Sequence, residues 1–384
     1  MNGTRADIAK SAGDRLEAAT LRTLRTVVGF DGFVDSIMDV VAERRTPAAG
    51  DYSRCARIED FARRCAAAAG LSTSLEIAVR EERFGGNAPL LAGALASIGA
   101  YTTLVGCVGD GAGGLHPLFD EVRRRCERSG GRVAPIAPPA LTHAMEFDDG
   151  KIMLNDPRSV RDVTWERVRS VEGIREMVET ARVVAVMNWT NMDAARAIIE
   201  ALAREFLATV ERPARLFVDL SDPARRRAED VRGVLEVLTR AEGAARVTLA
   251  MNLAEAGGVS TALGLGEMAA GHDADGVRRG AEAIRGRLKI DTVVVHPREG
   301  AAAAREGEAA WFDGPLCARP KLSTGAGDHF NAGFIVGQML DMTLAESLAL
   351  GCAASGAYVR DATSPTRERL VEFLRTLPEP EALG

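Results

Sequence analysis

Aromatic residues and long apolar runs are both scarce in this sequence. Only 5% of its 384 residues are aromatic, although 46% are hydrophobic and small residues abound. No apolar run approaches the roughly 20 residues that a membrane-spanning helix needs. The first twenty residues are polar and charged, without the apolar core of a signal peptide. We therefore expect a cytoplasmic protein with no membrane partner, whose helices and sheet pack closely through small side chains.

A net positive charge is also missing. The formal net charge is −6 at pH 7, whereas contacts with nucleic-acid phosphates require a basic surface. The six cysteines include no Cys-x-x-Cys pair, and the five histidines are dispersed, so the sequence gives no support for a zinc site. Scattered cysteines fit a reducing compartment. We expect no nucleic-acid partner.

Short apolar runs alternate with stretches of helical spacing through most of the chain. Runs typical of buried parallel strands occupy residues 26–30, 182–188, 215–221, 247–252 and 291–296. Helices are expected at residues 6–25, 88–100, 165–180, 192–208, 229–241 and 275–288. Repeated βα units of this kind predict an α/β fold, with a doubly wound, mainly parallel sheet that carries helices on both faces.

A hairpin interrupts this alternation. The runs LTHAMEF and KIMLN are separated by Asp148, Asp149 and Gly150, which is a hairpin signal. We expect one domain, residues 1–377, with a small antiparallel β lid. The lid segments would be residues 33–45, 75–84 and 141–156, and residues 378–384 would form a C-terminal tail.

One glycine-rich turn has the features that phosphoryl transfer needs. Gly325, Ala326 and Gly327 have little or no side chain, so their backbone N–H groups can approach an anion closely. Asp328 follows, where an amphipathic helix is expected to begin, and helix N-termini favour phosphate oxygens. Asp328 could then accept the proton of an attacking hydroxyl. The alternative is a glycine-rich turn in which Asp328 is an ordinary helix cap.

A second set of polar residues suits a polyhydroxylated ligand. Asp31 and Asp35 follow the first strand, at the sheet edge where open α/β folds bind ligands. Gly85 and Gly86 allow close backbone approach, and the Asn87 amide can both donate and accept. The alternatives are turn-forming aspartates and an Asn87 that merely caps the next helix.

Three ordered segments give a family resemblance. Residues 85–111, the pair Asn252 and Glu255 in an N-x-x-E pattern, and residues 323–334 resemble signatures of the ribokinase-like, or PfkB, family of carbohydrate kinases. The resemblance spans roughly residues 26–363. Residues 29–37 are also similar to a segment of the ADP-dependent sugar kinases of the same superfamily.

The resemblance implies a role for each matching residue. Asp328 matches the general base, and Gly325, Ala326 and Gly327 match the anion hole for the transferring phosphoryl group. Asn252 and Glu255 match the motif that places Mg²⁺ and phosphates, with Mg²⁺ held through water near Glu255 and no direct protein ligand. The positions that match sugar contacts are Asp35, Gly86 and Asn87, to which we add Asp31 on chemical grounds.

Two stretches depart from the family pattern. Leu322 stands where many members carry an aspartate that serves a monovalent-cation site, so that site lacks support. Residues 296–300 are bulkier than the corresponding nucleotide-side residues of many relatives. Within them, Arg298 is placed to contact a phosphate, and Gly300 fits the turn expected there.

These observations favour a Mg²⁺-dependent kinase that transfers the γ-phosphate of ATP to a hydroxyl, most simply a hydroxymethyl group, of a sugar-like substrate. The alternatives are a catalytically inactive sugar- or nucleotide-binding protein on the same fold, and a nucleoside or ADP-dependent kinase. A Rossmann dehydrogenase is disfavoured, because residues 29–32 lack the G-x-G-x-x-G spacing. The hairpin also offers an edge to a second copy, which leaves a homodimer open.

Overall fold

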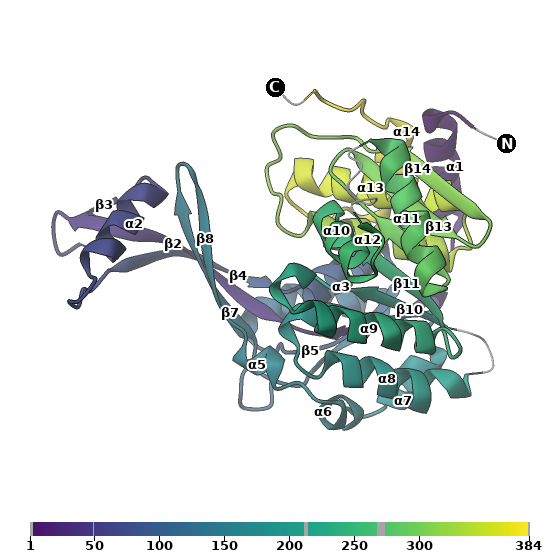
Figure 1. The fold of residues 1–384 in the computed structure, drawn as a ribbon, viewed down its shortest axis with the longest axis horizontal. Helices are drawn as coiled ribbons and strands as arrows, with labels where there is room; N and C mark the ends of the chain where they lie inside the picture. The colour runs from purple at the N-terminus through teal and green to yellow at the C-terminus, as the bar shows by residue number, and fades with distance from the viewer. Residues whose placement is uncertain (1–2, 49, 211–213, 267–272, 383–384) are drawn as a thin grey trace.

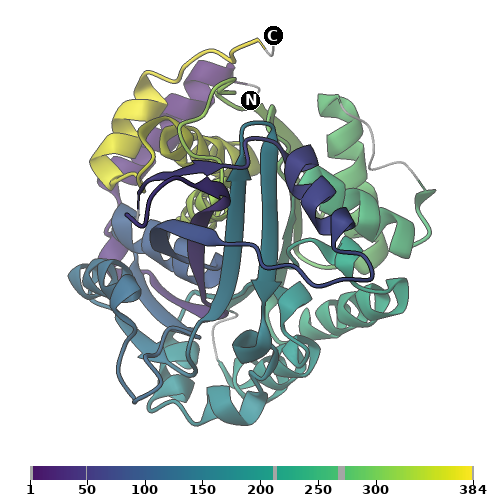
Figure 2. The same ribbon diagram turned by 90° about the vertical axis from the view of Figure 1, so that its left-hand side faces the viewer.

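The structure is a computed structural model that describes residues 3–48, 50–210, 214–266 and 273–382. It consists of a large body and a smaller sheet that projects from one side of it (Figures 1 and 2). We call the projecting sheet, with its one helix, the lid. None of the described helices is long and apolar enough to cross a membrane.

The body is built on a sheet of nine described strands. Its neighbouring strands run parallel from β6 to β12, and β13 and β14 extend it antiparallel. The mainly parallel sheet is therefore confirmed. In spatial order its strands are β6 (Arg132–Pro135), β5 (Tyr101–Gly106), β1 (Arg25–Phe30), β9 (Val183–Val186), β10 (Arg215–Asp219), β11 (Arg246–Met251), β12 (Thr292–Val295), β13 (Gly300–Arg305) and β14 (Glu308–Asp313).

Helices cover both faces of this sheet, as the doubly wound prediction requires. Side chains alternate along a strand, so Val184 of β9 packs in one buried cluster and Ala185 in the other. One face carries α6 (Trp165–Arg169), α7 (Ile174–Thr180), α8 (Ala195–Glu205), α9 (Ala228–Ala241), α10 (Leu253–Ala262) and α11 (Ala274–Leu288). The other carries α1 (Arg5–Ala18), α3 (Asn87–Ile98), α4 (Asp120–Ser129), α12 (Ala326–Met339), α13 (Leu344–Asp361) and α14 (Arg367–Arg375).

Two helices are shorter than predicted. The expected helix at 165–180 is divided into α6 and α7, because Gly173 takes a left-handed φ of 72° that a continuous right-handed helix cannot contain. The N-terminal helix ends at Ala18 and is followed by a short 3₁₀ turn, not continued to residue 25, since Ala19 is extended.

The lid is a five-stranded sheet formed by β2 (Phe33–Arg44), β3 (Tyr52–Arg54), β4 (Ile77–Gly85), β7 (Ala140–Phe147) and β8 (Gly150–Asp156). The predicted hairpin is β7 and β8, and α2 (Ile58–Ala67) packs against β8. The lid was expected to be antiparallel, but β2 and β7 pair in parallel. The sheet is mixed because β2 and β7 both leave the body from its sheet edge and run outward together.

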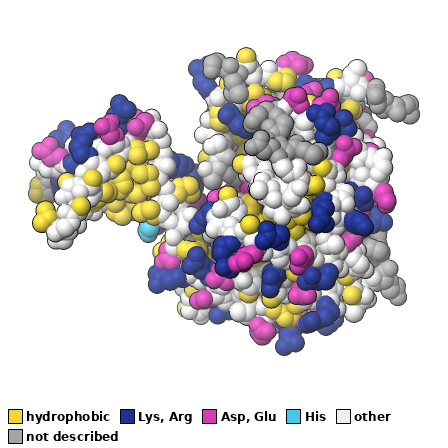
Figure 3. All heavy atoms as spheres, in the orientation of Figure 1, with side chains coloured by type: hydrophobic (Ala, Val, Ile, Leu, Met, Phe, Trp, Pro, Cys, Tyr) yellow, Lys and Arg dark blue, Asp and Glu magenta, His cyan; other side chains and the backbone are white. Residues whose placement is uncertain are grey.

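The lid exposes large apolar side chains. Figure 3 shows a concentration of them on the lid face that it displays. The exposed fractions lie between 41% and 54% for Ile77, Val79, Leu141 and Leu154, which the strand pairings place on one face of the lid sheet. A face of this kind is typical of a surface that contacts another molecule.

The described end of the chain lies against the body. Arg5 donates to the carbonyl of Pro378 at 2.6 Å, and Ala318 N–H donates to Glu381 at 2.8 Å. The expected C-terminal tail therefore makes contacts at residues 378 and 381. Its last two residues, 383–384, lie outside the described residues.

Candidate active site

Polar residues follow the carboxyl ends of five neighbouring strands. Asp31 follows β1, Asn188 follows β9, Asp219 ends β10, Asn252 follows β11 and His296 follows β12. The carboxyl ends of parallel strands meet at one edge of the sheet, which is where open α/β folds bind ligands. The body therefore gathers these side chains along a single edge.

The N-terminus of α12 brings Asp328 to the same edge. The residue that caps α12 is Gly325, which has a left-handed φ of 89°. Asp328 lies three residues further on, is only 5% exposed, and accepts a hydrogen bond from the Asn87 amide at 3.0 Å. The interpretation of Asp328 as an ordinary cap is therefore wrong. The first N–H groups of α12 lie beside it, and N–H groups in a first helical turn lack intrahelical acceptors.

Asn87 is oriented by a second bond. Its side-chain oxygen accepts from the hydroxyl of Ser221 at 3.2 Å, which leaves its NH₂ group to donate to Asp328. Gly86 precedes it as the N-cap of α3, so the interpretation of Asn87 as the cap is also wrong. Gly86 has a φ of 95°, and a Cβ there would lie 3.0 Å from the Cα of Gly32. Only glycine fits this approach without strain.

Asp31 lies behind Asn87. Its carboxylate accepts from the N–H groups of Asn87 at 3.0 Å and Ala88 at 2.7 Å, and from the Asn188 amide at 2.7 Å. Burial raises the pKa of Asp31, and these hydrogen bonds oppose the rise. Asp31 is fully buried, so the structure places it as the residue that holds the start of α3 and not at a surface.

Asp35 belongs to the lid. It lies on β2 opposite Arg83 of β4, and a Cβ on Gly85 would meet its carboxylate at 2.4 Å. Burial raises the pKa of Asp35, while a hydrogen bond from Thr142 and the charge of Arg83 lower it. The prediction placed Asp35 at the end of the first strand, but the chain has already entered β2 there. A movement of the lid would therefore carry Asp35 with it.

Asp219 was missed by the sequence analysis. It accepts from Asn331 of α12 at 2.8 Å and from the N–H of Ser221 at 2.9 Å, and it is only 6% exposed. Ser221 and Asp222 follow with φ values of 51° and 39°, which are unusual for residues other than glycine and typical of functional sites. Asp219 stands at the end of an apolar run, which is the same signal in the sequence that identified Asp31 as a candidate.

The carboxylates influence one another. Burial raises the pKa of Asp328 well above its ordinary value, and the charge of Asp219 raises it further. Burial also raises the pKa of Glu255 to about 7, again with a contribution from Asp219. A site with this much negative charge binds phosphates only if a cation offsets the repulsion.

Asn252 and Glu255 form a capping box at the start of α10. Glu255 N–H donates to the Asn252 side chain at 3.0 Å, and Asn252 N–H donates to the Glu255 carboxylate at 2.8 Å. The other oxygen of Glu255 accepts from Asp222 N–H at 3.0 Å. The motif therefore joins α10 to the loop after β10. Within the described residues, no group of three His, Cys, Asp or Glu side chains is placed to hold a metal ion.

A cavity of about 390 Å³ lies beside the N-terminus of α12. Burial lowers the pKa of His296 to about 4, so this ring is neutral at pH 7, and it lies 4.7 Å from the ring of Phe330. Gly300 was expected in a turn but begins β13, because the turn is completed at residues 298–299. The residues that line the cavity include Asn252, His296, Arg298, Gly300, Ala326, Gly327 and Phe330.

Comparison with solved structures defines the class of fold. A ribokinase from Thermotoga maritima superimposes with a TM-score of 0.62 at 15% identity, over 92% of this chain and 99% of that chain. A carbohydrate kinase from Agrobacterium tumefaciens gives 0.61 at 19% identity, over 93% and 98%. The body and lid therefore form a ribokinase-like fold, as the resemblance implied.

Comparison of sequences identifies the family. The family described as prokaryotic ketohexokinase matches residues 2–377. A ketohexokinase from Haloferax volcanii is 29% identical over 355 residues, which are 91% of this chain and 90% of that protein. The chain belongs to the prokaryotic ketohexokinase family. It is a carbohydrate kinase whose phosphoryl acceptor is an alcohol group.

Proposed function

We propose that this kinase transfers the γ-phosphate of ATP to a hydroxymethyl group of a ketohexose such as fructose. The observation that carries the proposal is the buried Asp328 carboxylate at the N-terminus of α12, held by Asn87. The names of the family and of its Haloferax volcanii member support the choice of sugar. The chemistry requires one base and a set of N–H donors.

In the proposed reaction, Asp328 accepts the proton of the sugar hydroxyl as that oxygen attacks the γ-phosphorus. The new O–P bond forms while the bond between the γ-phosphorus and its bridging oxygen breaks, and ADP leaves with the bonding electrons. N–H groups of Gly325, Ala326 and Gly327 stabilise the charge on the transferring group. Phosphoryl transfer is mainly a matter of positioning and electrostatics, so these groups suffice on the protein side.

The nucleotide fits the cavity beside α12. Arg298 and Asn252 are among its lining residues, and the first turn of α12 borders it. The residues present suit Mg²⁺ held through water, because burial and then the charge of Asp219 raise the pKa of Glu255, and a cation nearby would relieve that repulsion. Mg²⁺ would offset phosphate charge, and Asn252 and Glu255 would orient its water ligands.

The sugar fits on the other side of Asp328, under the lid. Asn87 and Gly86 approach it from the body and Asp35 from β2, while Asp31 holds Asn87 in place. The lid strands β2 and β4 join the body directly at Phe33 and Gly85. A shift of the lid would therefore move Asp35 relative to Asn87.

The exposed apolar face of the lid supports self-association into a homodimer. Large apolar side chains with exposed fractions near one half are costly to leave in water. Sedimentation measures the oligomeric state of the wild type and of a double variant that carries Val79→Lys and Leu154→Lys. A wild type that sediments as a monomer at micromolar concentration would rule the homodimer out.

The test of the proposed function is a phosphoryl-transfer assay. It compares fructose with other sugars and with nucleosides, ATP with ADP as donor, and the presence with the absence of Mg²⁺. Asp328→Asn should lower kcat by roughly 10²–10⁴-fold. Asp275→Asn is the matched control, because Asp275 is an exposed carboxylate on α11.

Each other outcome identifies an alternative. Wild-type activity in Asp328→Asn would refute Asp328 as the base. Calorimetric binding of sugar without turnover by any donor would indicate a binding protein. Preference for a nucleoside acceptor, or for ADP as donor, would indicate the corresponding kinase.

A further inference from the structure

Two carbonyl groups of the turn before α12 are held by side chains. The Tyr358 hydroxyl donates to the carbonyl of Thr324 at 2.7 Å. The Nδ1 atom of His329 lies 2.7 Å from the carbonyl of Gly325, which also accepts the backbone N–H of His329 at 3.1 Å. The peptide units that contain these carbonyls also contain the N–H groups of Gly325 and Ala326.

The hydrogen bonds of His329 have a fixed direction. The guanidinium of Arg125, which can only donate, donates to the Ser364 hydroxyl at 2.7 Å. The same hydroxyl lies 2.9 Å from Nε2 of His329. Burial lowers the pKa of His329 to about 4, so the ring carries one hydrogen at pH 7. Since Nδ1 faces a carbonyl oxygen, that hydrogen is on Nδ1, and Ser364 donates to Nε2.

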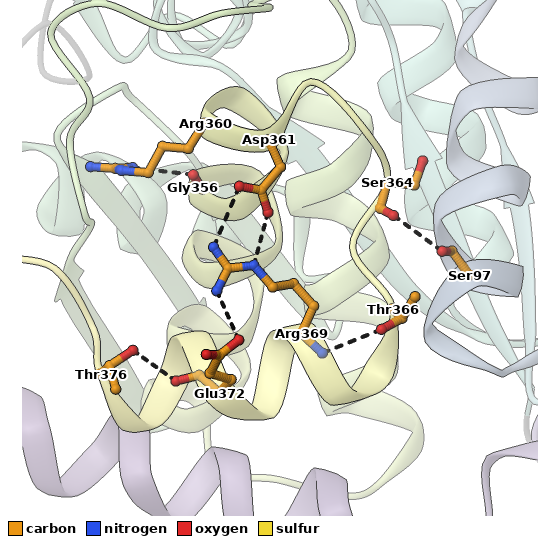
Figure 4. A network of polar contacts seen from close by, with 9 residues as sticks. All are labelled: Ser97, Gly356, Arg360, Asp361, Ser364, Thr366, Arg369, Glu372 and Thr376. Atoms are coloured by element: carbon orange, nitrogen blue, oxygen red, sulfur yellow. Dashed lines mark hydrogen bonds and ion pairs between the residues drawn. The ribbon is translucent and has the colours of Figure 1, made fainter.

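Ser364, which donates to His329, is held in place by the body. Ser97 of α3 donates to the Ser364 carbonyl at 3.3 Å, as Figure 4 shows. In the same view Arg369 pairs with Asp361 and so ties α14 to the end of α13, on either side of Ser364. The segment that carries Ser364 is therefore held from both sides.

His329 and Tyr358, which contact the turn, pack against each other. The rings of His329 and Tyr358 stack with centroids 3.6 Å apart and an interplanar angle of 13°. Burial raises the pKa of Tyr358 to about 12, with a contribution from Asp328, so its hydroxyl keeps its hydrogen and remains a donor. Both donors to the turn thus come from one stacked unit on α12 and α13.

We propose that His329 and Tyr358 are positioning residues of the anion hole, and that Ser364 and Arg125 set the donor direction of His329. This inference rests on the proposed function, in which the turn stabilises the transferring phosphoryl group. A peptide unit is planar, so fixing its carbonyl fixes the N–H on its opposite side. A hydrogen bond accepted by the carbonyl also polarises the unit and strengthens that N–H as a donor.

The backbone hydrogen bonds of the turn are compatible with this positioning role. Ala326 N–H donates to the carbonyl of Ser323 at 3.2 Å, a long bond that a phosphoryl oxygen can replace. Without the bonds from Tyr358 and His329, the peptide units before and after Gly325 would be free to rotate, because glycine tolerates many backbone conformations. Tyr358 and His329 therefore restrict the backbone rotation of Gly325, which would otherwise turn the N–H groups of the anion hole away from the phosphoryl group.

Three variants separate the donor from the ring. His329→Phe keeps a ring to stack on Tyr358 but has no donor, whereas His329→Asn places an amide donor near the position of Nδ1. We expect His329→Phe to lower kcat by about 10- to 100-fold, somewhat less than the loss of a direct oxyanion donor, with KM for both substrates within about 2-fold. His329→Asn should recover most of kcat, and Tyr358→Phe should resemble His329→Phe.

Two measurements do not depend on turnover. The ¹⁵N shifts of His329 should show a hydrogen on Nδ1 and none on Nε2. Affinity for MgADP with aluminium fluoride, a mimic of the transferring phosphoryl group, should fall in His329→Phe by about the same factor as kcat, while affinity for MgADP alone is unchanged. These readouts apply even if the wild type phosphorylates no sugar, an outcome that would refute the proposed function by itself.

The inference is overturned by any of three results. They are an unchanged affinity of His329→Phe for the fluoride complex, equal losses in His329→Phe and His329→Asn, and a hydrogen on Nε2 in the wild type. Thermal midpoints of both variants equal to that of the wild type would show that neither loss is due to unfolding.

Discussion

The side-chain amide of Asn87 donates to the carboxylate of Asp328 at 3.0 Å, although the two residues are 241 positions apart. The bond joins the first turn of α3 to the first turn of α12, and Ser221 fixes which end of the amide faces Asp328. The hydrogen bond favours the ionised carboxylate and so opposes the rise of the Asp328 pKa. Asn87 therefore favours the ionised form of Asp328, which is the form that a general base needs.

Asn87→Ala should move the acid limb of the kcat/KM profile to higher pH. The base must be ionised to act, and loss of the donor makes ionisation of Asp328 harder. We expect kcat at pH 7 to fall by about 10-fold or more, within the range that a positioned base contributes. Ser221→Ala removes a hydroxyl that contacts both the Asn87 amide and Asp219 but keeps the Asn87 donor, and it should have a smaller effect. An acid limb at the same pH in Asn87→Ala and the wild type would contradict this role.

Asp219→Asn should move the acid limb in the opposite direction. The charge of Asp219 raises the pKa of both Asp328 and Glu255, so its removal lets both ionise at lower pH. The measurement is the pH profile of kcat/KM at saturating Mg²⁺. Asp275→Asn should leave the profile unchanged, because Asp275 is exposed on α11. A profile of Asp219→Asn that coincides with that of the wild type would show that the carboxylates do not interact.

Asp328→Asn should stabilise the protein, and more so at higher pH. The pKa of Asp328 is raised in the folded state, so its contribution to stability is present below its ordinary pKa and is lost as the pH rises through the raised value. Asparagine carries no charge to bury, and its oxygen still accepts from Asn87. We expect the thermal midpoint of Asp328→Asn to exceed that of the wild type by about 2–4 °C at pH 8.

The pH dependence of that difference is the critical observation. Thermal melts at pH 5 and pH 8 should show the larger gain at pH 8. A gain at pH 5 that equals or exceeds the gain at pH 8 would contradict burial of an ionised Asp328. The same melts with Asp275→Asn control for the general effect of removing one negative charge.

Much of the fold follows from local pattern. Continuous apolar runs such as residues 182–188 and 215–221 became β9 and β10, because a strand buried on both faces needs apolar side chains on both. The strands that escaped prediction lack this signal. Residues 300–305 are mostly alanine, which has little strand preference, and they form β13 only because β12 and β14 lie beside them.

Some residues of the site could be predicted from local sequence motifs, and others could not. Asp328 and Asn87 stand in short motifs beside glycines, so the sequence marks them, and the structure brings them together. Asp219 has no such motif, and its importance arises from contacts with Asn331 and Ser221 that only the folded chain makes. His329 and Tyr358 are 29 positions apart on two helices, and helical spacing alone presents them as core residues. Long-range polar contacts were thus the part that local pattern could not supply.

Gly325→Ala should damage both stability and activity. Gly325 has a left-handed φ of 89°, and a Cβ there would lie 3.1 Å from the Tyr358 hydroxyl and 3.3 Å from Leu90. A left-handed conformation costs an ordinary residue roughly 1–2 kcal/mol, and a Cβ this close would also displace the hydroxyl from the Thr324 carbonyl. We expect a loss of about that size in the free energy of unfolding in urea, together with a lower kcat.

Gly286→Ala is the matched control, because it should change stability in the opposite direction. Gly286 lies inside α11, where a Cβ meets nothing within 4 Å, and alanine in a helix interior is favoured over glycine by about 0.5–1 kcal/mol. Its kcat should equal that of the wild type. If Gly325→Ala unfolded at the wild-type urea concentration and kept its kcat, the turn before α12 would not require glycine. The close packing of Tyr358 against that turn would then have no consequence for catalysis.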